Sequence, residues 1–162
     1  MIEAPVVAPG AAAPRAGGAT PYLWSDKLGS SAQRLRSNLQ GNDVTVSQTT
    51  DQRLWVSLPI DTAFATGRSA VKAPATGWLD QVAVALRELP RAEVQIVSDA
   101  DATGSATSAR VLALDRAASA RDWMVARGVL PQRISVAGRS AKPGAPPDQR
   151  RLDIMIGEKS PK

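Results

Sequence analysis

The stretch that most constrains the fold of this chain runs from Val94 to Gly128. It begins with a short apolar run typical of a buried strand, passes through an acidic loop rich in Gly, Ser and Thr, and continues as a long helical pattern. The helix, expected over 108–127, has a core-facing stripe formed by Ala113, Ala117, Ala120 and Met124. A lone strand and helix must bury their apolar faces against other elements, so the rest of the chain is interpreted as the scaffold of this unit.

Two opposite charges stand out within this stretch. Asp101 lies in the acidic loop, and Arg116 lies about two turns into the predicted helix. If the loop folds back over the first turns of the helix, the two side chains face one small zwitterionic ligand between them. Asp101 would accept from an ammonium group, and Arg116 would bind a carboxylate through two parallel N–H bonds, which a lysine cannot do.

The remaining elements follow from apolar periodicity. We expect one helix within 22–40, with Ser25 as its N-cap, and a second over 74–89. Strands are expected over 43–48, 53–58, 93–97, 133–137 and 151–156, and loops over 60–73 and 140–149. From residue 53 onward the order is β-α-β-α-β-β. This order predicts an α+β two-layer sandwich, a mixed sheet with helices on one face, preceded by an N-terminal helix and hairpin strand.

Composition sets the domain boundaries and limits the function. Residues 1–20 are mostly Ala, Pro and Gly and predict a flexible arm; 21–53 form the N-terminal extension, 54–157 the main domain, and 158–162 a polar tail. The chain has no His and no Cys, which excludes catalysis by a histidine-based triad and histidine metal sites within it. We expect no cofactor and no metal.

Charge and hydropathy bear on partners. Twenty basic and fifteen acidic residues are interspersed, giving a net charge of +5 without a dense basic run, so nucleic acid is not an expected partner. No run approaches the roughly 18 apolar residues of a membrane span, and residues 1–20 lack the pattern of a signal peptide. We therefore expect any export signal or membrane anchor to lie in a parent protein, outside this sequence.

Five short motifs occur in one order and at one spacing. They are Phe64–Lys72 (F-A-T-G-R-S-A-V-K), Ala100–Gly104 (A-D-A-T-G), Leu112–Ala117 (L-A-L-D-R-A), Ile134–Gly138 (I-S-V-A-G) and Gln149–Ile154 (Q-R-R-L-D-I). Together they resemble the OmpA-like peptidoglycan-binding domain shared by OmpA, Pal and MotB proteins, over about residues 54 to 157. The resemblance implies a non-enzymatic module in the periplasm of a Gram-negative cell envelope.

The resemblance also implies a ligand and its contacts. The ligand would be the diaminopimelate of the peptidoglycan stem peptide, whose free end carries an ammonium and a carboxylate. By position, Asp101 and Arg116 match the two ligand-binding residues of the family. Residues that would frame the site are Thr103, Gly104, Ala109, Arg150 and Arg151. Backbone N–H groups near 61–67 and at Thr107 or Ser108 would add donors, with Phe64 plugging the core nearby and Trp123 packing beside the helix.

The motifs depart from the family in ways that leave other interpretations open. Ser98-Asp99 replaces the family's glycine and its histidine or aromatic residue, which adds a negative charge, and Ala109 replaces an asparagine. A degenerate module that serves envelope protein–protein assembly is therefore an alternative function. At the residue level, Asp101 is alternatively a loop or cap residue, and Arg116 a surface cation paired with Asp115 or Asp122.

An enzyme is a further alternative. The run Asp99-Ala100-Asp101-Ala102-Thr103 directly after a strand mimics the D-x-D-x-T motif of haloacid-dehalogenase phosphotransferases, which use Mg²⁺ and an aspartate nucleophile. The chain offers no clear downstream acidic pair and few residues with which to build that larger fold. The binding module is the favoured prediction.

Overall fold

The computed structural model describes residues 21–39, 43–100, 105–140 and 150–159. The predicted arm at 1–20 and the loop residues at 101–104 and 141–149 lie outside the described residues. Within the described ranges, no helix has the length and apolar character needed to cross a membrane.

The chain folds into six strands and four α-helices over these ranges. In order they are β1 (Tyr22–Leu23), α1 (Asp26–Leu39), β2 (Thr45–Gln48), β3 (Leu54–Pro59), α2 (Ile60–Ala63), α3 (Ala75–Glu88), β4 (Ala92–Ala100), α4 (Ala106–Val125), β5 (Ile134–Ser140) and β6 (Arg151–Lys159). A short 3-10 turn, Pro131–Arg133, leads into β5. The predicted α+β class and the order β-α-β-α-β-β are confirmed.

All the strands form one mixed sheet with the order β2-β3-β6-β4-β5, and β1 pairs with the far end of β6. Only β4 and β5 run parallel, joined by α4, and every other pairing is antiparallel. Strand β6 lies at the centre, between β3 and β4. The carboxyl ends of these two parallel strands, Ala100 and Ser140, therefore lie side by side at one end of the sheet.

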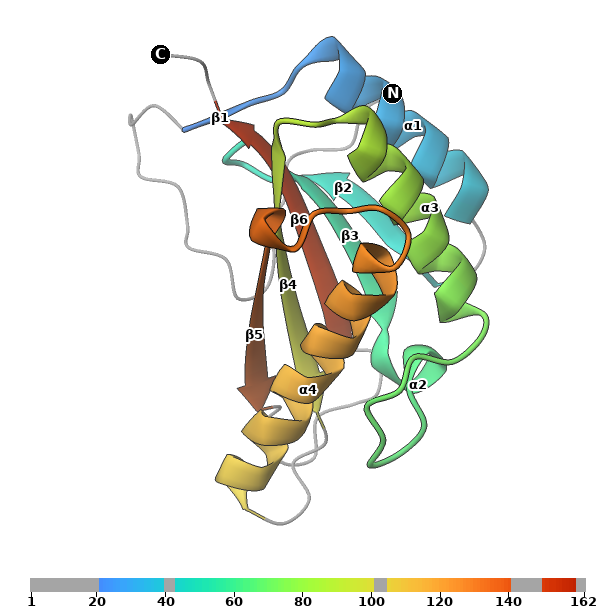
Figure 1. The fold of residues 1–162 in the computed structure, drawn as a ribbon, viewed down its shortest axis with the longest axis vertical. Helices are drawn as coiled ribbons and strands as arrows, with labels where there is room; N and C mark the ends of the chain where they lie inside the picture. Colours follow the sequence, from blue (N-terminus) through green and yellow to red (C-terminus); the bar gives the residue numbers. More distant parts are fainter. Residues whose placement is uncertain (1–20, 40–42, 101–104, 141–149, 160–162) are drawn as a thin grey trace.

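The three long helices cover one face of the sheet, as Figure 1 shows. Alternate residues of the central strands point into this layer, including Val56, Ile96 and Ile154, which are almost fully buried. The opposite face has a smaller apolar cluster of Trp55, Val97 and Met155. The sequence predicted the first layer correctly because the strands alternate with period two.

The core stripe of α4 is confirmed. Ala113, Ala117, Ala120 and Met124 are fully buried against the sheet. The small side chains let the helix approach β5 closely, and Gly138 completes this contact because a Cβ there would lie 2.7 Å from the backbone nitrogen of Leu114. This close packing holds the first half of α4 over the parallel pair.

The N-terminal helix was predicted within residues 22–40, with Ser25 as its N-cap. Tyr22 and Leu23 form β1, and α1 begins only at Asp26, after Ser25. The predicted cap is confirmed, since the Ser25 hydroxyl accepts a hydrogen bond from the Leu28 backbone nitrogen at 3.1 Å. Gly157 makes room for β1 because a Cβ at that position would lie 2.5 Å from the Tyr22 ring.

Several strands extend beyond their predicted ends. β4 continues to Ala100 and β5 to Ser140, and β6 runs to Lys159 rather than stopping at residue 156. The physical reason is pairing, since Asp99 lies opposite Arg139 in the parallel register and Glu158 lies opposite both Leu23 and Ala92. Pairing with a neighbour extends a strand through polar residues that periodicity alone assigns to loops.

Candidate functional site

The end of the molecule where β4 stops is also where α4 begins and where α2 and its following loop lie (Figure 1). Arg116 projects from the buried side of α4 into this end, and its residue exposure is only 1%. Its Nε donates to the carbonyl oxygen of Arg68 at 2.8 Å, and its Nη2 donates to that of Ala65 at 3.3 Å. The guanidinium therefore connects α4 with the loop after α2.

Two further contacts fix the Arg116 side chain. Its Nη1 lies 3.5 Å from the carbonyl oxygen of Asp99 near the end of β4. Its guanidinium carbon lies 5.2 Å from the centre of the Phe64 ring, within the range of a cation–π contact. Phe64 itself is 2% exposed and belongs to the main core, as predicted. The fork of Arg116 is thus held by one strand, one loop and one aromatic ring.

These contacts overturn one detail of the sequence interpretation. The surface-cation alternative for Arg116 is wrong, because the residue is buried and donates to main-chain carbonyl oxygens. In the loop after α2, Ala65 and Arg68 present these carbonyl oxygens to the guanidinium, as a cation requires. The backbone N–H donors expected near 61–67 stay a prediction.

Asp99 is buried on the opposite face of β4, with a residue exposure of 6%. Its Oδ1 accepts from Nε of Arg139 at 2.9 Å, and its Oδ2 accepts from Nη2 of Arg139 at 3.3 Å and from the backbone nitrogen of Arg151 at 2.8 Å. The extra negative charge noted at this position in the sequence is therefore paired. A nucleophilic role for Asp99, as in the phosphotransferase alternative, is disfavoured because both oxygens accept hydrogen bonds.

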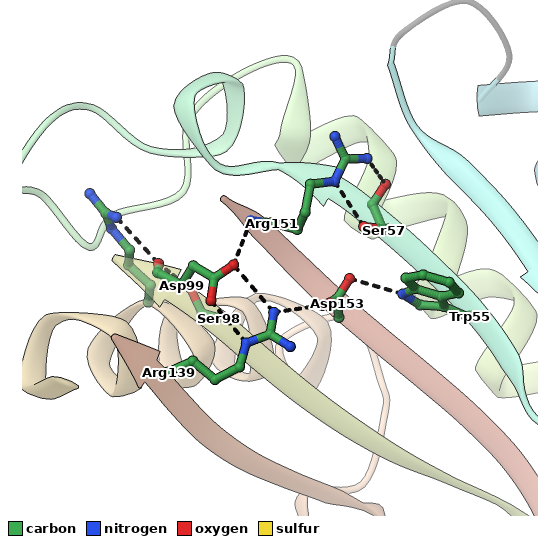
Figure 2. A network of polar contacts seen from close by, with 8 residues as sticks. Trp55, Ser57, Ser98, Asp99, Arg139, Arg151 and Asp153 are labelled. Carbon is green, nitrogen blue, oxygen red and sulfur yellow. Dashed lines mark hydrogen bonds and ion pairs between the residues drawn. The ribbon is translucent and has the colours of Figure 1, made fainter. Parts of the chain in front are cut away.

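Arg139 also reaches a second carboxylate. Its Nη2 lies 2.7 Å from Oδ2 of Asp153, whose side chain is fully buried, and Oδ1 of Asp153 accepts from the indole nitrogen of Trp55 at 2.9 Å. Figure 2 shows the guanidinium between the two carboxylates, with Trp55 beyond Asp153. Burial alone would lower the pKa of Arg139, because it disfavours the charged guanidinium. The hydrogen bonds and negative charges of Asp153 and Asp99 have the larger combined effect, so the pKa of Arg139 is raised above its usual value.

The two arginines predicted to frame the site lie just before β6 and at its first residue, and they have different surroundings. Arg150 pairs with Asp61 of α2 at 3.0 Å, which links the start of the central strand to the region of Arg116. Arg151 donates from Nε to the Ser57 hydroxyl at 2.9 Å and from Nη2 to the Ser57 carbonyl oxygen at 2.8 Å. Of the two, Arg150 is the one whose carboxylate partner lies on α2.

The other predicted site residues divide into two groups. Asp101, Thr103 and Gly104 lie outside the described residues, so their positions stay predictions. Ala109 is described and 2% exposed, on the buried side of α4. Of the two backbone donors expected at the start of α4, that of Ser108 is occupied, because it donates to the capping hydroxyl of Ser105 at 3.0 Å.

Sequence reasoning missed the network of Asp99, Arg139, Asp153 and Trp55. One signal for it was present, since Asp153 is a charged residue inside the otherwise apolar run Leu152–Ile156. A carboxylate in such a run must have a partner if it is buried. Sequence alone does not identify that partner, because Arg139 is 14 residues away in the chain and reaches Asp153 across β4. Among the described residues, no three His, Cys, Asp or Glu side chains come together as metal ligands.

The mixed sheet, the helices on one face and the arginine buried on the connection between the parallel strands define the OmpA-like class of α+β domain. The chain belongs to the OmpA family, whose model matches residues 63–151, more than half of the 162 residues. The resemblance found in the sequence motifs is thereby confirmed.

Several known proteins are similar to this chain in sequence or in fold. Over 105 residues the chain is 28% identical to the probable lipoprotein YiaD of Escherichia coli K12, covering 65% of this chain and 48% of that protein, so it spans about half of its relative's length. The cell wall anchor of the T6SS from Pseudomonas aeruginosa has a similar fold, with a TM-score of 0.65 at 21% identity, over 79% of this chain and 97% of that one.

Two further solved structures share the fold. The periplasmic domain of Helicobacter pylori MotB matches with a TM-score of 0.62 at 20% identity, over 75% of this chain and 83% of that one. The peptidoglycan-associated lipoprotein of Burkholderia pseudomallei matches with a TM-score of 0.53 at 21% identity, over 61% of this chain and 93% of that one.

Proposed function

We propose that this domain binds peptidoglycan non-covalently through the diaminopimelate of the stem peptide, and thereby anchors a cell-envelope protein to the cell wall in the periplasm. Asp101 accepts from the ammonium of diaminopimelate, and Arg116 binds its carboxylate. The domain acts by binding and carries out no reaction.

The observation that carries this proposal is the burial of Arg116 beside the end of β4. A guanidinium that is 1% exposed, held by three main-chain carbonyls, is costly to desolvate, and such a residue is expected where a rigid cation is needed. Asp101 is the second residue after Asp99, whose carbonyl oxygen faces Arg116. The position of Arg116 beside the end of β4 therefore supports a zwitterion-binding pair of Arg116 and Asp101.

Membership of the OmpA family supports the same function, as do the printed descriptions of a cell wall anchor and of a peptidoglycan-associated lipoprotein with this fold. Arg150 and Asp61 are expected to border the ligand, since their ion pair joins β6 to α2 next to the loop that contacts Arg116.

The alternative function, envelope protein–protein assembly without peptidoglycan binding, is supported by one specific observation. Ala109, which replaces the family's asparagine, is 2% exposed and offers no side-chain donor or acceptor. A ligand would therefore lose one amide contact in this domain. The two functions differ in whether purified sacculi retain the protein.

The test is co-sedimentation of the purified domain with peptidoglycan sacculi. Wild type should sediment, and Asp101→Ala and Arg116→Lys should each weaken binding by about thirty-fold or more, because loss of a charge-assisted contact costs about 2–5 kcal/mol. Arg91→Ala is the matched control, since Arg91 is exposed and precedes β4 at the opposite end of the strand. Sacculi with lysine in place of diaminopimelate lack the second carboxylate and should retain the protein poorly.

Two outcomes would contradict the proposal. Equal sedimentation of wild type and of both site variants would assign retention to the basic surface. No sedimentation of wild type would favour the assembly function.

A further inference from the structure

The end of β4 is held differently from the rest of the strand. The pairing of β4 with β6 ends at Ser98, whereas its pairing with β5 continues to Ala100. At Asp99 a side chain takes over the connection to β6, because its Oδ2 accepts from the backbone nitrogen of Arg151 at 2.8 Å. Both carboxylate oxygens also accept from Arg139 of β5, at 2.9 and 3.3 Å. The Asp99 side chain therefore joins the end of β4 to both neighbouring strands (Figure 2).

The carbonyl oxygen of Asp99 has two donors on the helix side of the sheet. Ser98 Oγ donates to it at 3.0 Å, and Nη1 of Arg116 lies 3.5 Å from it. Ser98 is fully buried and lies on the same side as the core residue Ile96, two positions earlier in the strand. A distance of 3.5 Å is long for a hydrogen bond, so a small movement of this carbonyl is enough to break its contact with Arg116.

We propose that Ser98 and Asp99 are positioning residues for the guanidinium of Arg116. The Asp99 carboxylate fixes the end of β4 against both neighbouring strands, and the Ser98 hydroxyl orients the carbonyl oxygen that faces Arg116. Neither side chain is placed to contact a ligand, because Ser98 is fully buried and both oxygens of Asp99 accept from protein donors.

These two residues are also a point at which the chain departs from the family motif, since Ser98-Asp99 replaces a glycine and a histidine or aromatic residue. In this chain both side chains act on one carbonyl group, Ser98 by a direct hydrogen bond and Asp99 through the position of its own residue. We therefore interpret the departure as a means of holding Arg116 in place.

The consequence for ligand affinity rests on the proposed function. Arg116 is expected to bind the carboxylate of diaminopimelate through two parallel N–H bonds, so a shift of its guanidinium would misplace both bonds at once. Asp101 follows Asp99 by only two residues, so the same contacts fix the point at which its loop leaves β4. Ser98 and Asp99 should therefore affect affinity without contacting the ligand.

The first test uses the full chain without peptidoglycan. Ser98→Ala removes the hydroxyl, and Asp99→Asn replaces one carboxylate oxygen by an NH₂ group that cannot accept a hydrogen bond. NMR measures how fast the Nη1 protons of Arg116 exchange with water. Each variant should speed this exchange by about three- to tenfold, the factor that one net hydrogen bond contributes.

Gln95→Ala is the matched control. Gln95 lies on the same face of β4 as Asp99, four residues earlier, and its Oε1 accepts from Nη1 of Arg53 at 3.3 Å. This variant loses a side-chain hydrogen bond of the same strand but none beside Arg116, so the exchange of the Arg116 protons should match wild type. A merely structural role of Ser98 and Asp99 would instead speed exchange in all three variants in proportion to their loss of stability.

The second test is co-sedimentation with diaminopimelate-containing sacculi, under conditions where circular dichroism shows that every variant is folded. Ser98→Ala and Asp99→Asn should each bind about three- to tenfold more weakly than wild type, and Gln95→Ala should bind equally well.

The two tests separate failure of the proposal from failure of the proposed function. Unchanged proton exchange in either variant would overturn its positioning role, whatever the binding. Faster exchange with wild-type affinity for sacculi would overturn the effect on the ligand. If wild type itself does not sediment while exchange is faster in both variants, the proposed function fails and the positioning of Arg116 stands.

Discussion

Asp99 and Arg139 form a two-pronged ion pair across the parallel strands β4 and β5, where they are register partners. The Oδ1–Nε distance is 2.9 Å, and the Oδ2–Nη2 distance is 3.3 Å. The main chain of Asp99 faces the other way, with its carbonyl oxygen 3.5 Å from Nη1 of Arg116. One residue of β4 therefore joins the buried network on one face of the sheet to the candidate site on the other.

The first prediction concerns the cation of this network. Arg139→Ala leaves the carboxylates of Asp99 and Asp153 without their shared partner, and Asp153 is fully buried. Breaking a buried pair in this way should lower the free energy of unfolding by about 3–5 kcal/mol. Urea unfolding at neutral pH is the measurement, and Arg139→Lys should recover only part of the loss because a point charge cannot span both carboxylates.

The control is an exposed ion pair. Arg34 contacts Glu88 at 2.6 Å, but both side chains are nearly half exposed. Arg34→Ala should therefore change the free energy of unfolding by no more than about 1 kcal/mol. Equal effects of the two alanine variants would mean that the buried network contributes nothing beyond surface charge.

The second prediction separates binding from stability at Arg116. If this residue only contacted ligand, Arg116→Ala would leave stability unchanged. Its hydrogen bonds to the carbonyl oxygens of Arg68 and Ala65 argue otherwise, since loss of a charged donor costs about 1.5–3 kcal/mol. Arg116→Ala should stay folded at 25 °C with a lower urea midpoint, whereas Arg110→Ala, an exposed arginine on the same helix, should match wild type. A midpoint for Arg116→Ala at the wild-type value would show that these contacts are not stabilising.

Whether a feature of the fold or of the candidate site could be predicted from sequence depends on how far apart in the chain the residues that determine it lie. Strands and helices follow from local periodicity, and the spacing of the family motifs predicts Arg116 and Asp101 as the ligand-binding pair. The partners of Arg116 and Asp99 are set by tertiary packing, which brings residues 48 and 40 positions away in the chain into contact. Neither partner could be chosen among the many arginines and main-chain carbonyls of this sequence without the sheet register.

The ends of these strands could not be predicted from sequence for a related reason. Ala100 and Ser140 are strand residues only because β4 and β5 pair there, and β1 exists only because Tyr22 finds room above Gly157. Alternation in the sequence carries no information about either contact. The Ser25 and Ser105 caps involve residues only three positions away, so local sequence is informative at these positions.

The third prediction concerns Phe64, which is 2% exposed and lies against the guanidinium of Arg116. Phe64→Ala removes a ring from the core and should lower the free energy of unfolding by about 3–5 kcal/mol. Leu130→Ala is the control, because Leu130 is 58% exposed and should change stability by no more than about 0.5 kcal/mol. Thermal or urea unfolding measures both, and similar midpoints would contradict the burial of the ring.

The fourth prediction compares two glycines with opposite surroundings. A Cβ at Gly138 would lie 2.7 Å from the Leu114 nitrogen and 2.9 Å from the Arg110 carbonyl oxygen, both backbone atoms that cannot rotate away. Gly138→Ala must therefore move α4 away from β5, and overpacking of this kind costs about 1–3 kcal/mol. Gly77 lies inside α3 with no atom within 4 Å of its Cβ position, so Gly77→Ala should stabilise the helix by about 0.5–1 kcal/mol.

The same displacement should reach the candidate site. Arg110 and Leu114 lie within two turns of Arg116 on α4, so moving this part of the helix shifts the guanidinium relative to the carbonyl oxygens of Ala65 and Arg68. Gly138→Ala should then weaken sacculus binding under conditions where it is still folded, while Gly77→Ala binds as wild type. The unfolding midpoints should move in opposite directions for the two variants. If Gly138→Ala is as stable as wild type and binds equally well, the close approach of α4 to β5 does not position Arg116.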